Sequence, residues 1–293
     1  MSFQVHLIDG TYELFRHFFA VPSRKTEAGA EVGALRGVLS SVISLLEQGA
    51  THLAVATDQV IPSFRNDLWA GYKDGSEVAP EIAEQFAPLE EGLRALGVEV
   101  WPMVEFEADD ALAAGAALMS ADPRVKEVLI CTPDKDLAQC VGGKVFQWDR
   151  RKNLLFDSDG VRDKYGVFPE SVPDYLALVG DSADGFPGLK GWGQKSSATV
   201  LDRYGSVELI PDDSEEWDVT VRSSRALAAT LAAHREEAML FKKLATVRLD
   251  APVANSVEDL EWQCPAANFE EFCISNRMEP LVLRTQKLVT DRA

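Results

Sequence analysis

Short apolar runs alternate with amphipathic stretches along the first half of the chain. Four runs rich in valine, leucine, isoleucine and alanine have the length and composition of buried β-strands. They are residues 3–8, 52–57, 98–101 and 128–132. Apolar positions that recur every three or four residues predict helices between them, over residues 12–19, 32–47, 80–96 and 108–119. This alternation predicts an α/β fold, with a mostly parallel central sheet, right-handed crossovers and helices on both faces.

The pattern changes after about residue 160. Prolines and glycines interrupt short helical stretches, and few β-type runs remain. Helices are expected over residues 173–179, 194–204 and 222–245, with a glycine-rich loop over residues 180–193. We therefore predict an α/β core over residues 1–165 and a helical subdomain over residues 166–293.

Aspartates stand directly after three of the predicted strands. They are Asp9, Asp58, Asp134 and Asp136. Because ligands of parallel sheets bind outside the carboxyl ends of the strands, we expect these side chains to lie at one site. Aspartate also serves as a helix N-cap in strand-to-helix turns, and that role accounts for one or two of the four.

A second acidic group opens the alanine-rich helix predicted over residues 108–119. Its members are Glu107, Asp109 and Asp110. Glu107 and Asp110 are three positions apart, so they share a helix face. Taken alone, the group is explained equally well by the helix dipole, which favours acidic residues in a first turn. Asp181 and Asp184, farther along the chain, enlarge the acidic set and favour a functional site.

The chemistry of such a set is that of hard cations. Many carboxylates in one pocket raise one another's pKa unless cations are bound. Ligation by oxygen alone indicates Mg²⁺ or Mn²⁺ rather than Zn²⁺. Two such ions about 4 Å apart form the clamp used for displacement at phosphorus. The chain has four histidines and no evident Ser-His or Cys-His pair, so metal-ion catalysis is the predicted chemistry.

Glycines and lysines cluster before the helix predicted over residues 194–204. Backbone N–H groups at a helix start, with nearby lysines, suit the phosphates of a nucleic-acid backbone. A G-x-G pattern before a helix is weak evidence by itself, but its place just after Asp184 strengthens it. The predicted nucleic-acid-binding residues are Gly188, Lys190, Gly191, Gly193, Lys195 and Ser196.

Bulk properties modify this picture only in part. A net charge of −18 argues against nucleic acid as a partner, but bound divalent metals would cancel part of it, and local patches matter more than the sum. The four cysteines form no C-x-x-C pair and are expected to be reduced thiols. No apolar run approaches the roughly 20 residues of a membrane span, and the start lacks signal-peptide features. We expect a cytoplasmic protein without a membrane partner.

Five motifs, in this order, resemble those of the 5′-nuclease superfamily, which includes flap endonucleases and the 5′-nuclease domain of bacterial polymerase I. They are Leu7–Gly10, Asp58 with Phe64-Arg65 and Tyr72-Lys73, Glu107–Asp110, Thr132–Asp136, and Gly180–Gly188. The resemblance implies a PIN-like or resolvase-like core with a helical arch region at about residues 65–95. It also implies a helix–turn–helix hairpin that binds DNA in the second domain. Since no polymerase region follows, a stand-alone bacterial member of actinobacterial origin is expected.

The resemblance also implies roles for the metal ligands. The first metal ion would be held by Asp9, Asp58, Glu107 and Asp109. The second would be held or oriented by Asp134, Asp136, Asp181 and Asp184, together with Asp109. Asp110 matches a further carboxylate of the family that acts through water or at an auxiliary ion.

Other roles concern the nucleic acid. Lys73 and Arg65 would steady the scissile phosphate, and Tyr72 would lie near unpaired nucleotides. Without the resemblance, these three residues would be interpreted as a solvated helix face. Their match to the positions of the family motif favours a role in binding nucleic acid. The glycine-rich hairpin would bind K⁺ between Gly188 and Gly193, beside duplex phosphates.

The predicted function is a structure-specific 5′ nuclease, acting as 5′-3′ exonuclease and flap endonuclease by two-metal-ion catalysis. Its expected partners are flapped, gapped or 5′-ended duplex DNA and RNA–DNA hybrids, bound by a monomer during primer removal and repair. Three alternatives differ in sequence. A PIN-type ribonuclease would lack the hairpin after Asp184, a non-catalytic junction-binding protein would have an unfilled carboxylate position, and a phosphatase would carry a second Asp two residues after Asp9.

Overall fold

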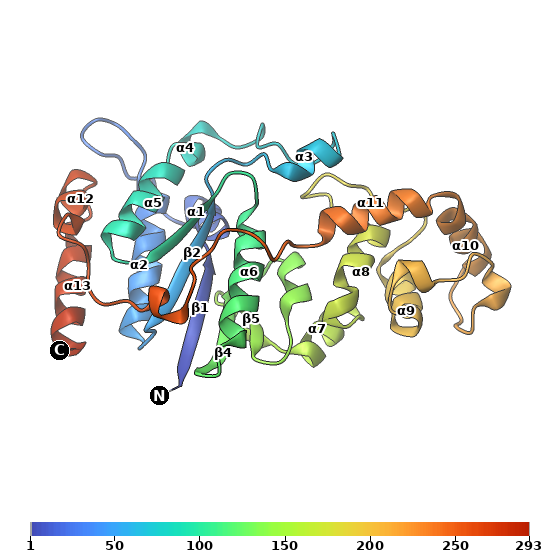
Figure 1. Cartoon of the computed structure of the whole chain (residues 1–293). Coiled ribbons are helices and arrows are strands. Elements are labelled where there is room, and N and C mark those ends of the chain that lie inside the picture. Colours follow the sequence, from blue (N-terminus) through green and yellow to red (C-terminus); the bar gives the residue numbers. More distant parts are fainter. Residues whose placement is uncertain (1, 293) are drawn as a thin grey trace. The chain divides into compact units, whose positions relative to one another are not determined.

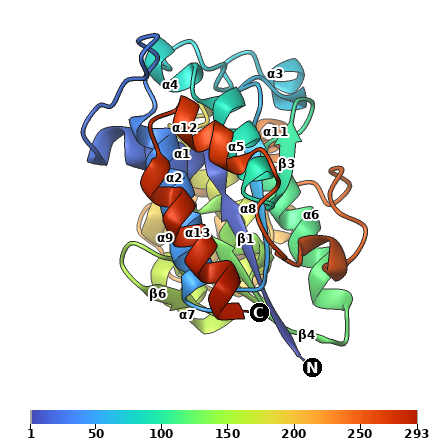
Figure 2. The same cartoon turned by 90° about the vertical axis from the view of Figure 1, so that its left-hand side faces the viewer.

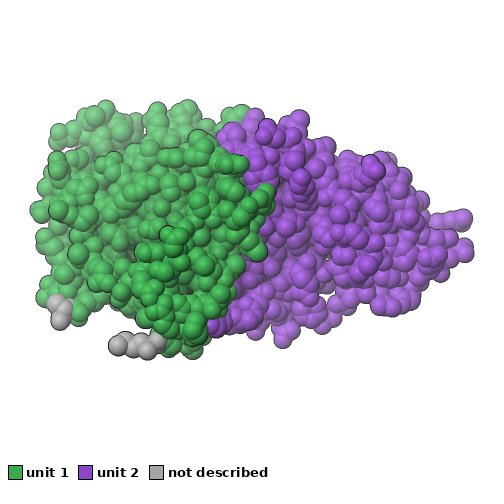
Figure 3. Space-filling model, in the orientation of Figure 1, with its two compact units in different colours: residues 1–61, 75–132, 248–293 green, residues 62–74, 133–247 purple. Residues whose placement is uncertain are grey.

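The computed structural model describes residues 2–292. The chain forms two compact units, which are coloured separately in Figure 3: unit 1 is residues 1–61, 75–132 and 248–293, and unit 2 is residues 62–74 and 133–247. The expected boundary between residues 165 and 166 coincides with no edge of these units, because residues 133–165 group with unit 2 and residues 248–293 with unit 1. The predicted domain boundary between residues 165 and 166 therefore stays a prediction.

A parallel sheet lies at the centre of unit 1. Its strands stand in the order β3 (Glu99–Met103), β2 (His52–Asp58), β1 (Phe3–Asp9) and β4 (Val125–Cys131). Each neighbouring pair is parallel. Both faces of β1 and β2 are buried along most of their length, which explains why their sequences are continuous apolar runs. The predicted mostly parallel α/β fold is confirmed.

Helices cover both faces of this sheet. The connections that lead from β1 through β2 to β3 contain α1 (Gly10–Ala20), α2 (Gly33–Glu47) and α5 (Phe86–Ala95), whereas α6 (Ala108–Ala121) leads from β3 back to β4. Because crossovers are right-handed and the last one runs back across the sheet, α6 covers the opposite face. Figure 2 shows β1 between α2 and α6. Two C-terminal helices complete the unit, α12 (Phe269–Ser275) against α5 and α13 (Glu279–Arg292) against α2.

The prediction of one continuous helix over residues 80–96 is wrong. The segment is divided into α4 (Pro80–Ala83) and α5, with Gln85 at the break. The side chain of Gln85 is buried, accepts the N–H of Leu35 near the start of α2 (3.0 Å) and donates to the carbonyl of Glu81 (2.7 Å). A tertiary hydrogen bond at a helix start therefore outweighs the local helical pattern.

Unit 2 is mostly helical, as expected for the second half of the chain. Around α8 (Val172–Val179) pack α9 (Gln194–Tyr204) and α11 (Arg235–Ala245), with α10 (Ser224–Ala233) against α11. The same unit contains the short α3 (Phe64–Leu68) and α7 (Ser158–Tyr165). Figure 1 labels these elements. Stacked rings of Phe186 and Phe241, with centroids 5.5 Å apart, lie in its core.

Unit 2 differs from the prediction at several points, since neither α3 nor α7 was expected. The helix expected over residues 222–245 is divided at His234, whose backbone is not helical (φ −128°, ψ 25°), and the acidic Glu236 and Glu237 occupy the first turn of the new helix. An antiparallel pair of strands, β5 (Val145–Asp149) and β6 (Leu154–Phe156), was not predicted. Among residues 2–292, no helix is both long and apolar enough to cross a membrane.

Candidate metal centre

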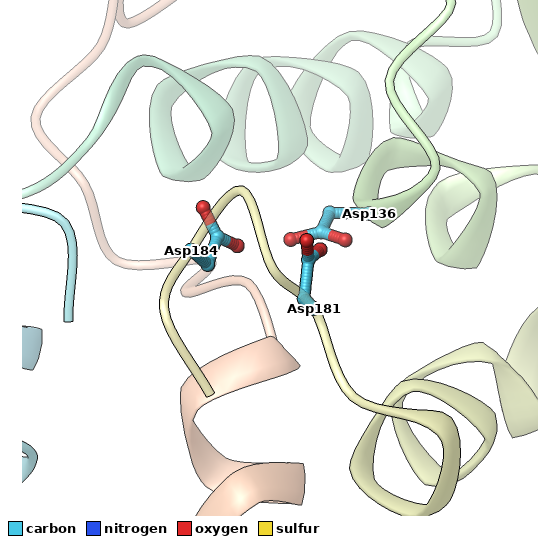
Figure 4. A group of neighbouring side chains, drawn as sticks. All are labelled: Asp136, Asp181 and Asp184. Atoms are coloured by element: carbon cyan, nitrogen blue, oxygen red, sulfur yellow. The ribbon is translucent and has the colours of Figure 1, made fainter. Parts of the chain in front are cut away.

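Unit 2 brings three of the predicted ligands together. One carboxylate oxygen from each of Asp136, Asp181 and Asp184 lies within 4.8 Å of the other two, and all three residues are buried. Figure 4 shows the three side chains, with Asp181 and Asp184 on one loop. Asp136 begins a short 3-10 helix (Asp136–Cys140), and the loop connects α8 to α9.

A tight turn sets the spacing of the two loop aspartates. The N–H of Asp181 donates to the carbonyl of Phe186 (2.8 Å), and the N–H of Phe186 donates back to the carbonyl of Asp181 (3.0 Å). The Asp181 side chain also accepts the N–H of Ala183 (2.9 Å). These bonds close the loop on itself, so both carboxylates are held by backbone geometry.

Two lysines contact this cluster. Lys73 Nζ lies 2.9 Å from Asp184 Oδ1, and Lys135 Nζ lies 2.5 Å from Asp181 Oδ2. Burial lowers the pKa of Lys135, but its bond to Asp181 and the surrounding aspartates outweigh burial and raise that pKa above its usual value. The sequence predicted Lys73 and missed Lys135, whose only signal was its position between Asp134 and Asp136.

Asp136 carries the strongest electrostatic perturbation of the cluster. Burial, and then the charges of Asp134, Asp184 and Asp181, raise the pKa of Asp136 well above its usual value. Among the described residues, its Oδ1 is buried without a hydrogen-bond partner. An orphaned carboxylate oxygen beside two further carboxylates fits a hard divalent cation, which would supply the missing positive charge. Asp134 is exposed, and its Oδ1 accepts the N–H of Asp136 (3.1 Å).

The predicted ligands of unit 1 lie at the carboxyl ends of adjacent strands. Asp9 ends β1 and Asp58 ends β2. Asp9 caps α1 by accepting the N–H of Tyr12 (2.8 Å), and its other oxygen accepts the hydroxyl of Thr132 (2.9 Å). Asp58 accepts the N–H of Ala108 (2.8 Å), which fastens the start of α6 to the end of β2. The N-cap alternative for Asp9 is therefore realised, and the ligand role of both residues stays a prediction.

The acidic group at the start of α6 also has structural roles. Glu107 is the N-cap of α6, and Asp110 accepts the N–H of Glu107 (3.0 Å) in a capping box. The other oxygen of Asp110 accepts the N–H of Arg248 (2.8 Å), and the side chain is fully buried. Both Asp110 oxygens thus bind backbone, while Asp109 is partly exposed in the first turn. Metal binding by Glu107, Asp109 and Asp110 stays a prediction.

Arg65 and Tyr72 lie inside unit 2. Arg65 is 2% exposed, and its guanidinium donates to the carbonyls of Leu244 (2.8 Å) and Thr246 (3.2 Å) at the end of α11. Tyr72 is 5% exposed, with the ammonium of Lys73 5.6 Å from its ring centroid. The geometry gives Arg65 a backbone-binding role and Tyr72 a packing role. Contact of either residue with a phosphate or a nucleotide stays a prediction.

The predicted nucleic-acid-binding residues lie on the turn before α9 and in the first turn of that helix, which together form the hairpin. Gly193 is the N-cap of that helix, and its N–H donates to the hydroxyl of Ser196 (3.1 Å). Lys190, Gly191, Gly193 and Lys195 are exposed. The buried indole of Trp192 donates to the carbonyl of Leu227 (3.2 Å) and anchors the hairpin to α10. The hairpin thus presents glycine backbone and two lysines to solvent.

Comparison with known families gives two matches that together cover most of the chain. Residues 4–166 match the family described as 5′-3′ exonuclease, N-terminal resolvase-like domain, and residues 167–268 match 5′-3′ exonuclease, C-terminal SAM fold. The expected actinobacterial origin is not tested by these matches and stays a prediction.

Individual relatives agree with the family matches. The 5′-3′ exonuclease of Aquifex aeolicus is 32% identical over 266 residues, which cover 90% of this chain and 88% of that protein. DNA polymerase I of Bacillus caldotenax is 34% identical over 269 residues, which cover 90% of this chain but only 30% of the polymerase. The chain therefore spans less than a third of the length of that relative.

Solved structures show the same fold. The 5′-exonuclease of bacteriophage T5 with bound zinc ions has a TM-score of 0.66 at 17% identity, with 98% of both chains covered. The catalytic core of Rad2 in complex with DNA substrate has a TM-score of 0.63 at 17% identity, covering 98% of this chain and 92% of that one. Together, the motifs, the fold and the family matches confirm the predicted resemblance and nuclease class: this chain belongs to the 5′-3′ exonuclease family.

Proposed function

We propose that this chain is a divalent-metal-dependent, structure-specific 5′ nuclease that hydrolyses DNA phosphodiesters near a 5′ end or a single-strand-to-duplex junction. The observation that carries the proposal is the buried cluster of Asp136, Asp181 and Asp184, with the ammonium of Lys73 beside it. Membership of the 5′-3′ exonuclease family supports the reaction class. The proposed metal is Mg²⁺ or Mn²⁺, because every candidate ligand atom is an oxygen.

Two sets of carboxylates would each hold one metal ion. Asp136, Asp181, Asp184 and Asp134 would hold one ion, and Asp9, Asp58, Glu107 and Asp109 the other. When bound, such ions lower the pKa of water and stabilise the leaving oxygen of a phosphodiester. Lys73 binds a non-bridging phosphate oxygen through its ammonium. Lys135 orients the Asp181 carboxylate through their ion pair. Catalysis then needs no histidine base.

The hairpin before α9 would bind the sugar–phosphate backbone of duplex DNA. Lys190, Gly191 and Lys195 are exposed. The N–H of Gly191 and the ammonium groups of the two lysines are donors of the kind that phosphates accept. Such contacts read shape and charge rather than base sequence. The exposed backbone at Gly191 and Gly193 also suits a cation held by carbonyl oxygens, so K⁺ at residues 188–193 is part of the proposal.

The partners follow from this chemistry. A T5 flap endonuclease was solved in a complex with DNA and metal ions, and Rad2 with DNA substrate. We propose that this chain likewise binds flapped, gapped or 5′-ended DNA, and RNA–DNA hybrids left by primers, as a monomer. The four cysteines are free thiols, two of them buried, which supports a reducing compartment such as the cytoplasm.

A cleavage assay tests the proposal. A 5′-labelled flap DNA and the matching single strand are incubated with Mg²⁺, Mn²⁺ or chelator, using the parent protein and the Asp136→Asn and Asp181→Asn variants. Asp163→Asn serves as the matched control, since Asp163 is an exposed aspartate of α7. We expect metal-dependent cutting near the junction by the parent and the control, little cutting of the free strand, and none by the two cluster variants.

The contrary result is equally clear. Tight binding of the flap without cleavage in either metal would leave a non-catalytic junction-binding protein. If neither DNA is cut while an RNA strand of the same sequence, incubated in parallel, is cleaved, a ribonuclease is favoured instead. Equal activity in all four proteins would place the chemistry outside the aspartate cluster.

A further inference from the structure

A basic pocket lies in unit 1, in a part of the chain that the proposed nuclease chemistry does not use. Its volume is about 470 Å³, and it opens between the end of α1, the loop after it and the first half of α2. Although Asp and Glu outnumber Lys and Arg by 47 to 29 in the chain, no carboxylate of the described residues lines it. Its polar wall is formed by His17, Arg24, Arg36, Ser40, Ser41 and Ser44.

Two arginines of this wall have no carboxylate partner. Among residues 2–292, the guanidinium groups of Arg24 and Arg36 form no ion pair and no hydrogen bond, and the Nε atom of each is buried. An arginine that is partly removed from water without a partner costs free energy unless an anion satisfies it. The pocket therefore holds two positive charges that no carboxylate of the described residues pairs.

The neighbouring carboxylates are already engaged. Glu31 accepts the N–H groups of Arg24 and Gly33, both at 2.8 Å. Glu47 pairs with Arg284 of α13 at 2.7 Å. Hydrogen bonds to these donors lower the pKa of both carboxyl groups, against the opposing effect of burial, which is the largest single influence on Glu31. Neither glutamate lines the pocket, so neither neutralises its arginines.

The serine wall is backed by further positive charge. Arg284 donates to the hydroxyl oxygens of Ser40 (2.7 Å) and Ser44 (2.9 Å). The Ser44 hydroxyl donates its own hydrogen to the backbone carbonyl of Ser40 (2.9 Å). The Ser40 hydroxyl accepts from the guanidinium, so its hydrogen can turn toward another acceptor. A phosphate oxygen inside the pocket is such an acceptor.

The floor of the pocket depends on a close helix contact. A Cβ at Gly37 of α2 would lie 2.5 Å from Nδ1 of His17 on α1, so glycine lets the imidazole sit directly against α2. Nε2 of His17 lies 3.3 Å from the buried carboxylate of Glu13. Among the described residues, Nδ1 is buried without a hydrogen-bond partner. The imidazole therefore forms the floor of the pocket, with Nδ1 packed against Gly37.

We infer that this pocket binds a phosphate group, with Arg24 and Arg36 donating to its oxygens and the Ser40 hydroxyl completing the contact. Guanidinium groups match phosphate in both charge and geometry, and hydroxyl groups add neutral donors. The phosphate belongs to one of two sources with this shared chemistry: a small molecule such as inorganic phosphate or a nucleotide, or the backbone or end of a nucleic-acid strand. The inference does not rest on the proposed nuclease function.

Binding of inorganic phosphate to the full chain tests this inference. Titration calorimetry is done in chelator, with chloride replaced by phosphate at constant ionic strength, so that divalent metal sites do not contribute. The variants are Arg36→Gln and Arg24→Gln, and the matched control is Arg94→Gln, whose half-exposed arginine lies on α5. Saturable binding by the parent and the control, weakened about tenfold or more in both pocket variants, is expected. Arg36→Lys should recover part of the affinity.

Folding and ligand source are checked separately. Circular dichroism and Tm identify any variant that has lost its fold. If one pocket variant has lost its fold, the phosphate affinity of the other pocket variant tests the inference. Oligonucleotides with a 5′-phosphate or a 5′-hydroxyl are titrated in parallel. If Arg36→Gln lowers the affinity for the phosphorylated strand only, the ligand is a terminal phosphate. If it lowers the affinity for both strands, the ligand is the phosphodiester backbone. If it lowers the affinity for inorganic phosphate alone, the ligand is a small molecule. Absence of saturable phosphate binding, or equal affinity in parent, pocket variants and control, would overturn the inference, whatever the cleavage assay shows.

Discussion

Lys73 and Asp184 are joined twice, once through their side chains and once through the backbone. Lys73 Nζ lies 2.9 Å from Asp184 Oδ1, and the N–H of Lys73 donates to the carbonyl of Asp184 (3.1 Å). The backbone bond holds the lysine in register with the carboxylate cluster, so its ammonium is positioned before any substrate arrives. This preorganisation is the reason to assign Lys73, rather than the buried Arg65, to the phosphate.

Replacement of Lys73 by methionine should therefore reduce cleavage strongly. We expect kcat to fall by about 10²-fold or more, because a charged donor to the reacting phosphate is lost. Metal affinity should not fall, since Asp184 loses a competing cation. Steady-state cleavage and metal titration measure the two effects. Lys152→Met, which removes a more exposed lysine of the same unit, should leave both unchanged. A Lys73→Met variant with parental kcat would remove this residue from the mechanism.

Asp136→Asn should stabilise the metal-free protein at neutral pH. Burial and neighbouring carboxylates raise the pKa of folded Asp136 above its unfolded value. Its stabilising contribution is therefore present below the unfolded pKa, near 3.8, and is lost as the pH rises through the raised folded pKa. Asparagine removes that loss, so we expect Tm in chelator to rise by about 2–4 °C at pH 7, with little gain at pH 4.

The same variant should lose the stabilisation that divalent metal gives the parent. Thermal unfolding across pH, with and without Mg²⁺, measures both effects, and Asp163→Asn should follow the parent. A lower Tm for Asp136→Asn in chelator at neutral pH would show that the ionised carboxylate is stabilising, contrary to this account.

Arg65→Met should destabilise the protein. The substitution keeps a long side chain but leaves the carbonyls of Leu244 and Thr246 without their donor, which should cost about 2–3 kcal/mol. Urea unfolding measures the change, and Arg225→Met, which replaces an exposed arginine of α10 in the same unit, should be close to neutral. If stability is unchanged while kcat falls, Arg65 acts on the phosphate, as the family resemblance implied, and its bonds to α11 are incidental.

Gly188→Ala should also destabilise the protein, by more than about 2 kcal/mol. Gly188 has φ +67°, and a Cβ there would lie 2.3 Å from the backbone nitrogen of Gly180 and 2.6 Å from the carbonyl oxygen of Leu178. Gly193→Ala is the matched control in the same hairpin, because its φ is −122° and a Cβ meets nothing within 4 Å. Equal stability of the two variants would contradict the close approach of the two backbone segments.

The chain's apolar pattern was enough to place the parallel strands of unit 1, because a strand buried on both faces must be apolar throughout. It also placed the helices between those strands, but not the C-terminal helices α12 and α13. The pattern failed at Gln85, where a hydrogen bond to the start of α2 interrupts a predicted helix. It also failed at His234, where a new helix begins. The strands β5 and β6 were missed because their pairing is a contact between segments, and β6 is only three residues long. Local propensity does not encode such contacts.

The candidate site follows the same division. The sequence pattern predicted that Asp136, Asp181 and Asp184 belong to one acidic site, and the structure brings these three together. The place of Lys73 beside them was implied by the family resemblance. Only the tertiary structure revealed that Lys135 pairs with Asp181, that Asp110 binds two backbone N–H groups and that Arg65 binds the end of α11. Residue type determines what a side chain is able to bind. Which partner it does bind depends on the groups that folding brings within reach, and burial decides whether any solvent or ligand competes for it.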